Sequence, residues 1–305
     1  MNWIIAVLIG HFFNAISFVL DKIVLTKSIK DPYAFTFHVG LLGLISLVFI
    51  PFGFELPSNT QLALNLCTGI FFALSLLTFF LALASGETSR VVPFIGAAIP
   101  IFTLILEILF LHGQFSLNQL FAFGVLVFGT FFITLELKKK KPSARKHHQQ
   151  MNAWILGIIA ALFFAICFVM TKAAFDHQPF LSAFIWMRIG TFLFVLIFLL
   201  VAKHRKNIMR VFSLYTHKEA FPYMGSQLGG GIGFLCVNYA ISLAPVALVN
   251  AMQGVQYAFL LIMAMIGSIK YPQFITESMT QKELVLKSIA VIIIGAGLAL
   301  VAINA

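Results

Sequence analysis

Several charged and polar side chains lie within apolar stretches long enough to cross a bilayer, and they are the residues whose chemistry can be interpreted. Arg188 lies well inside one of these stretches, beside Trp186. An ionisable side chain at the centre of a bilayer costs roughly 3 kcal/mol, so it faces a packed interior or a water-filled cavity. A guanidinium there needs a carboxylate, carbonyl oxygens or an anionic ligand. We therefore predict that Arg188 either contacts a substrate or holds helices together as a structural pair.

Amide side chains recur at helical spacing further along the chain. Asn250, Gln253 and Tyr257 fall on one face of a helix, and Gln256 lies close to that face. Such a stripe can line a cavity and bind a zwitterion, or it can bond to neighbouring helices. The complete predicted substrate-binding set is Arg188, Asn250, Gln253, Gln256, Tyr257, Asn14, His11, His38, Trp186, Gln227 and Asn238.

A second group of residues has features of coupling or gating. Glu107 is the only acid well inside an apolar run, where it could carry a coupling proton or pair with a basic or amide group. A run of glycines around Gly230 allows either helix bending or close packing. Two lysines end apolar runs, where they either snorkel to the interface or line a cavity mouth. The predicted set is Glu107, Lys22, Lys172, Gly229, Gly230, Gly231 and Gly233.

The sequence contains no pattern that points to catalysis. It has no nucleophile with a paired base, no carboxylate pair, no phosphate-binding loop and no metal-ligand spacing. The adjacent His147 and His148 have no further ligands nearby and are interpreted as loop residues. We predict that the protein is not an enzyme and has no catalytic residue, metal site or cofactor.

The composition places these residues in a membrane protein. The chain is 61% hydrophobic and 10% charged, whereas soluble domains average about 25% charged residues. A spanning helix needs about 20 apolar residues, and no segment alternates as a barrel strand does. We predict an all-α polytopic membrane protein with ten transmembrane helices, near residues 3–22, 33–53, 62–84, 88–111, 118–136, 152–174, 180–202, 219–243, 246–268 and 284–304.

The sequence also contains an internal repeat. Met1–Gly40 aligns without a gap on Met151–Gly190, which pairs Lys22 with Lys172 and Gly40 with Gly190. Each copy then holds an odd number of spans, so the two copies must insert in opposite orientations, as in secondary transporters. We predict two inverted five-helix repeats, residues 1–137 and 151–305, joined by a basic linker at 138–150.

The distribution of lysine and arginine predicts the orientation. Apart from Lys172 and Arg188, these residues lie in the connections that follow odd-numbered spans or at the span ends that border those connections. The positive-inside rule places the basic loops 138–150 and 203–218 in the cytoplasm and both termini outside. Although the net charge is +10, we expect the basic run at 138–146 to lie near anionic lipid headgroups and not to bind nucleic acid.

These features together resemble the drug/metabolite transporter superfamily, specifically its EamA-type members with ten spans in two five-helix repeats. The resemblance covers nearly the whole chain. Gly113-Gln114 stands where the family often has Gly-Glu, and the family is usually drawn with cytoplasmic termini. The matching features are the aromatic runs ending in lysine at Phe12–Lys22 and Phe163–Lys172, Arg188-Ile-Gly190, Ala82–Ser89 leading to Pro93 and Pro100, and Gly113–Gln119 leading into Gly124 and Gly129.

The resemblance implies a central cavity with alternating access and a small-metabolite or drug substrate. The predicted spans hold more basic than acidic side chains in their interiors. We therefore predict a secondary transporter of the bacterial inner membrane for an amino acid or another zwitterionic or anionic solute. A drug or cation exporter, a lipid-linked substrate flippase and a non-transporting membrane scaffold are the alternatives. The expected partners are the small-molecule substrate and membrane lipids, with no nucleic acid, and the protein is expected to be a monomer or homodimer.

Overall fold

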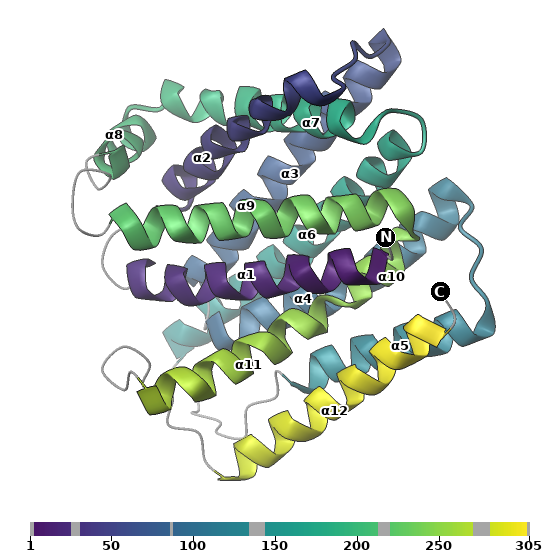
Figure 1. Cartoon of the computed structure of the whole chain (residues 1–305). Helices are drawn as coiled ribbons and strands as arrows, with labels where there is room; N and C mark the ends of the chain where they lie inside the picture. The colour runs from purple at the N-terminus through teal and green to yellow at the C-terminus, as the bar shows by residue number, and fades with distance from the viewer. Residues whose placement is uncertain are drawn as a thin grey trace.

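The computed structural model describes residues 3–25, 31–85, 88–133, 144–212, 220–270 and 281–303. These residues form helices and no strands, joined by short connections (Figure 1). The elements are α1 (Trp3–Leu25), α2 (Pro32–Leu42), η1 (Gly43–Phe52), α3 (Asn59–Ser85), α4 (Thr88–Leu111), α5 (Leu117–Phe132), α6 (Ala144–Phe175), α7 (Phe180–Val195), η2 (Leu196–Leu200), α8 (Ala202–Phe212), α9 (Ala220–Leu243), α10 (Val246–Ala251), α11 (Gln253–Lys270) and α12 (Gln281–Ile303).

Eight of these helical segments are long and apolar enough to cross a membrane, which confirms the prediction of an all-α polytopic membrane protein. They are Trp3–Leu20, Pro32–Phe52, Asn59–Ser85, Phe94–Leu111, Met151–Phe175, Phe180–Leu200, Val246–Met263 and Glu283–Ile303. The two other predicted spans fall on helices that differ from these. Helix α5 is apolar but has only 16 residues, and α9 is diluted by glycines and by the amides Gln227 and Asn238.

The second and seventh predicted spans share an unusual change of helix type. Each begins as an α-helix and ends as a 3₁₀ helix, at η1 after Leu42 and at η2 after Val195. Runs of 3₁₀ helix longer than a few residues are uncommon, and they often mark a hinge or a strained sequence. The ninth predicted span is also not one continuous helix, because a turn at Met252 separates α10 from α11.

Helices from distant parts of the sequence lie side by side. Helix α1 runs along α9 and also contacts α11, while α3 runs along α6 and α7 (Figure 1). Helix α4 packs on α6, and α5 pairs with α12 at the edge of the bundle. Large apolar side chains such as Phe110, Leu117 and Ile292 are exposed, as expected where lipid replaces water around the outer surface.

Glycines allow the closest of these approaches. A Cβ on Gly233 of α9 would lie 2.7 Å from the carbonyl oxygen of Gly10 in α1. A Cβ on Gly69 of α3 would lie 2.2 Å from the carbonyl oxygen of Met187 in α7. Small residues at such crossings let helix backbones pack tightly within a membrane. The glycines therefore fix the spacing of α1, α3, α7 and α9, which surround the candidate site.

Candidate functional site

Arg188 occupies a buried aromatic enclosure between three helices. Its side chain projects from α7 and is only 6% exposed. The guanidinium carbon lies 4.3 Å from the ring centre of Phe72 in α3, 4.5 Å from that of Phe234 in α9 and 5.4 Å from that of Phe184 in α7. The negative faces of aromatic rings attract a cation at these distances. The enclosure therefore holds a guanidinium where α3, α7 and α9 meet.

No carboxylate neutralises Arg188 within the described part of the chain. Its buried Nε atom has no hydrogen-bond partner, and the carboxylates of Asp176 and Asp31 lie elsewhere, beside Lys172 and His204. A desolvated charge without a partner is energetically costly. An anionic group that entered the enclosure would therefore stabilise the guanidinium strongly. The enclosure supplies a positive charge and three apolar walls.

A second buried polar group joins α1 to α11. Nδ1 of His11 lies 3.4 Å from Oε1 of Gln256 in a buried hydrogen bond. The other ring nitrogen of His11, Nε2, is buried and has no partner. Two residues of the predicted substrate-binding set are therefore brought together, and Nε2 of His11 remains without a hydrogen-bond partner.

Two of the remaining ninth-span residues, Asn250 and Tyr257, face α4. Nδ2 of Asn250 donates a hydrogen bond of 3.1 Å to the hydroxyl of Thr103. The hydroxyl of Tyr257 lies 3.5 Å from the carbonyl oxygen of Val92 and against Gly96, where a Cβ would be only 2.2 Å away. Gln253 is half-buried at the start of α11, directly after the turn. Asn250 and Tyr257 thus bond to a neighbouring helix, which is one of the two roles predicted for this stripe.

The α1–α9 crossing contains three more of the predicted residues. Oδ1 of Asn14 packs on Gly233, where a Cβ would lie 2.3 Å away. Asn238 is 1% exposed, and its side-chain amide donates a hydrogen bond of 2.8 Å to the carbonyl oxygen of Phe234 in its own helix. Gln227 is half-buried on α9. Asn14 therefore packs on Gly233, which immediately precedes Phe234 of the Arg188 enclosure. Asn238 instead forms its hydrogen bond within α9.

The glycines predicted to gate α9 are not equivalent. Gly229 and Gly230 approach Phe13 and Ser17 of α1, and Gly233 is the tightest contact. A Cβ on Gly231 would meet no atom within 4 Å. Three of the four glycines therefore serve close packing, the other role considered for this run.

His38 and Trp186 lie apart from the Arg188 enclosure. Nε2 of His38 lies 3.2 Å from the carbonyl oxygen of Ile208 in α8, and the His38 ring meets the Phe212 ring edge-on at 4.7 Å. Trp186 stacks on Phe54 at 5.9 Å, and its buried Nε1 has no partner. His38 is aligned with Arg188 in the predicted repeat, but it contacts α8 and not the aromatic enclosure.

The predicted coupling residues Glu107 and Lys172 have protein partners. Glu107 is 3% exposed, and its carboxylate accepts the backbone N–H groups of Val246 at 3.1 Å and Ala247 at 2.7 Å. It therefore binds the N-terminus of α10. Lys172 forms an ion pair of 2.7 Å with Asp176 one turn later in the chain. The side chain of Lys22 lies outside the described residues.

The three phenylalanines around Arg188 could not have been found from the sequence. The chain has 35 phenylalanines, and nothing in their spacing distinguishes Phe72, Phe184 and Phe234. Thr103, the partner of Asn250, was also missed, because one threonine in an apolar run carries no signal. Among the described residues, no three His, Cys, Asp or Glu side chains come together as a metal site.

The helices and their buried polar groups define a polytopic α-helical membrane protein. Residues 1–135 match the model of the EamA-like transporter family, which is part of the drug/metabolite transporter superfamily. The predicted resemblance is thus confirmed over the first 135 residues, and the members of this family are transporters.

Comparison with solved structures extends the likeness in fold to the whole chain. A crystal structure described only as that of a protein superposes with a TM-score of 0.65 at 14% identity, covering 98% of this chain and 99% of that one. In all, 27 chains of solved structures match. No curated protein matches the sequence. At this identity the likeness concerns the fold alone.

Proposed function

We propose that the protein is a secondary transporter of the bacterial inner membrane that moves an amino acid or another small zwitterionic or anionic metabolite by alternating access. Ten helices, grouped as inverted repeats at residues 1–137 and 151–305, would rock around a central site. The substrate carboxylate would bind Arg188. The EamA match over residues 1–135 supports the transporter class, and the buried arginine without a carboxylate partner in the described chain supports the substrate class.

The packing of the helices supports the inverted repeat. The repeat makes α1 equivalent to α6, α3 to α9, and α4 to α10–α11. A two-fold relation then requires each contact between halves to have a counterpart. The contact of α1 with α9 corresponds to that of α6 with α3, and the contact of α1 with α11 corresponds to that of α6 with α4. The shared change to 3₁₀ helix after α2 and α7 is a second correspondence.

Contacts between connections support the alternation of spans across the membrane. Asp31, which precedes α2, contacts His204 and Asn207 of α8. At the opposite end of α2–η1, the side-chain amide of Gln61 donates a hydrogen bond of 3.0 Å to the carbonyl oxygen of His177, which lies in the connection before α7. The start of α2 thus lies on the same side as α8, and the η1–α3 connection lies on the other side with the α6–α7 connection. The positive-inside rule assigns the side with α8 to the cytoplasm.

The buried charge favours an anionic group on the substrate. Glu107, the buried carboxylate of the described chain, is committed to α10 and does not pair with Arg188. A carboxylate can accept two parallel hydrogen bonds from a guanidinium. A cationic drug would have to approach an unneutralised positive charge within the low dielectric of the enclosure. The charge therefore favours a metabolite carboxylate over a cation.

A thermal-shift screen of the purified protein tests this function. Amino acids, other organic anions, cations and lipid-linked sugars would be compared, because a ligand that binds only the folded state raises the melting temperature. We expect zwitterions or anions to raise it in the wild type and in Arg205→Gln, which changes an exposed arginine of α8. The shift should be lost in Arg188→Gln. A response to cations or lipid-linked compounds alone would overturn the proposal in favour of export or lipid flipping.

A further inference from the structure

Helix α8 must lie at the membrane surface. The seventh predicted span ends with η2 at Leu200, and α8 begins at Ala202. One intervening residue leaves no room for the chain to move away from the bilayer, since a residue spans at most about 3.6 Å. Figure 1 shows α8 at one end of the helix bundle, beside the ends of α2 and α7. The sequence analysis predicted only a basic loop at residues 203–218, so α8 became evident only from the structure.

The inner face of α8 is fixed to α2 and its neighbours. Ile208 and Val211 are 0% and 4% exposed within an apolar cluster that includes Ala34 and Phe37 of α2. The carbonyl oxygen of Ile208 lies 3.2 Å from Nε2 of His38. Helix α8 is therefore docked on the protein and is not a free amphipathic segment.

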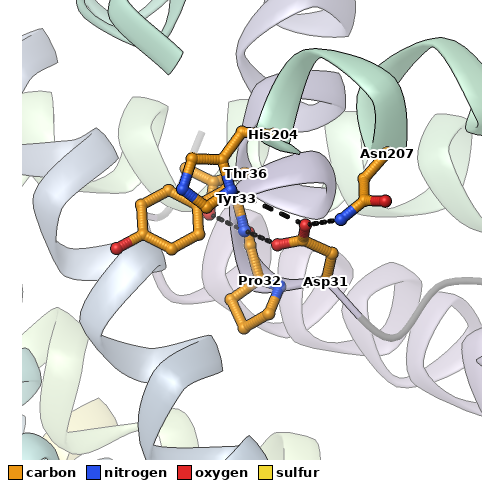
Figure 2. A network of polar contacts seen from close by, with 6 residues as sticks. All are labelled: Asp31, Pro32, Tyr33, Thr36, His204 and Asn207. Carbon is orange, nitrogen blue, oxygen red and sulfur yellow. Dashed lines mark hydrogen bonds and ion pairs between the residues drawn. The ribbon is translucent and has the colours of Figure 1, made fainter. Parts of the chain in front are cut away.

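A polar network attaches the start of α2 to the same helix (Figure 2). Asp31 caps α2 by accepting the backbone N–H of Tyr33 at 3.0 Å, and its other carboxylate oxygen accepts the amide N–H of Asn207. His204 lies 3.7 Å from that same oxygen and stacks on the Tyr33 ring at 3.9 Å. One carboxylate thus joins the first turn of α2 to two residues of α8.

The outer face of α8 is cationic. Lys203, Lys206 and Arg210 are exposed, and their spacing of three and four residues places them on one stripe of the helix. No acidic residue lies within Ala202–Phe212. Met209 is 55% exposed, and Leu200, immediately before the helix, is 82% exposed. Basic residues next to apolar side chains are typical of helices that lie in the membrane interface.

We propose that Lys203, Lys206 and Arg210 form a docking surface for the phosphodiester headgroups of anionic lipids. The occupant is a lipid and not a soluble anion, because the stripe lies at the end of a span with Leu200 and Met209 exposed beside it. The Asp31 network and the His38 contact connect this surface to α2. Bound lipid would therefore hold the cytoplasmic end of α2 against α7 and α8.

The test is a lipid titration of the full-length protein in an uncharged detergent. Phosphatidylglycerol, phosphatidylcholine and inorganic phosphate would be added separately, and the melting temperature would be recorded. We expect phosphatidylglycerol alone to raise the melting temperature. In the variant K203Q/K206Q/R210Q, the lipid concentration that gives half the maximal shift should rise about 10-fold or more, since several surface cations each contribute.

A matched control removes the same charge elsewhere. The variant K138Q/K139Q/K140Q removes the same charge from the basic linker, which is also expected to lie near anionic headgroups, and it should shift the titration clearly less than K203Q/K206Q/R210Q does. Without lipid, the K203Q/K206Q/R210Q variant should still fold and melt cooperatively, so that its titration can be compared with that of the wild type. The proposal is overturned by any of three results: an unchanged titration in that variant, an equal loss in the linker variant, or an equal shift with phosphatidylcholine or inorganic phosphate.

Discussion

The carboxylate of Glu107 accepts the backbone N–H of Ala247 at 2.7 Å, so the end of α4 is bound to the first turn of α10. The second carboxylate oxygen accepts the N–H of Val246 at 3.1 Å. Free N–H groups and a partial positive charge at a helix N-terminus favour a carboxylate. The only acid within an apolar run thus holds the broken ninth span in place.

Removing this carboxylate should destabilise the protein. Glu107→Ala leaves two buried N–H groups without an acceptor, so the free energy of unfolding should fall by about 2 kcal/mol or more. Denaturant unfolding in detergent would measure the loss. Glu55→Gln, at an exposed carboxylate in the connection after η1, is the matched control and should change the stability little. Equal stability of Glu107→Ala and wild type would contradict the helix-binding role.

Much of the helical framework could be predicted from the sequence. The predicted span 88–111 coincides with α4, because a long apolar run with polar ends has one stable arrangement in a bilayer. Helix α8 was missed, since its docked face holds only two buried apolar residues, Ile208 and Val211, among basic ones. The turn at Met252 was not predicted, because residues 246–253 contain no proline or glycine.

The candidate site could be predicted only in part. Arg188, His11 and Gln256 could be identified from the sequence, because polar side chains within apolar runs are costly to bury and therefore rare. The partners depend on tertiary packing. The hydrogen bond between His11 and Gln256 joins residues far apart in the chain, and the choice of Phe72 from among many phenylalanines has no local cause.

Two glycines of α9 should respond in opposite ways to the same substitution. In Gly233→Ala, the new methyl group would meet the carbonyl oxygen of Gly10 and the side chain of Asn14, so the variant should lose about 1–3 kcal/mol of stability. Gly231→Ala meets nothing within 4 Å, and alanine favours the helix, so this variant should be as stable as the wild type or more so. Thermal unfolding of the two variants in detergent distinguishes them. A Gly233→Ala variant as stable as Gly231→Ala would argue against the close α1–α9 crossing.

The hydrogen bond between His11 and Gln256 should appear as an energetic coupling. Its length of 3.4 Å is at the long end of the range, so the coupling should be about 0.5–1 kcal/mol. A double-mutant cycle of His11→Phe, Gln256→Leu and the double variant, measured by unfolding, gives this value. Strictly additive effects would show that α1 and α11 are not joined through these side chains.

The orientation can be tested by labelling from the two sides of the membrane. Lys203→Cys and His177→Cys place single new thiols at the two ends of α7, in a background in which Cys67, Cys167 and Cys236 are replaced by alanine. In right-side-out vesicles, a membrane-impermeant maleimide should label residue 177 and leave residue 203 unlabelled until the membrane is opened. The reverse pattern would mean that the termini are cytoplasmic.

Solute flux through proteoliposomes is the most direct test of the central claim that Arg188 binds an anionic group of a transported metabolite. The solute that gives the largest thermal shift would be loaded on one side, and exchange with its labelled form would be followed for the wild type, Arg188→Lys and Arg188→Gln. We predict rapid exchange in the wild type, reduced exchange in Arg188→Lys because a lysine lacks the planar two-pronged contact, and almost none in Arg188→Gln, with all three proteins folded. Wild-type exchange by Arg188→Gln would contradict the account.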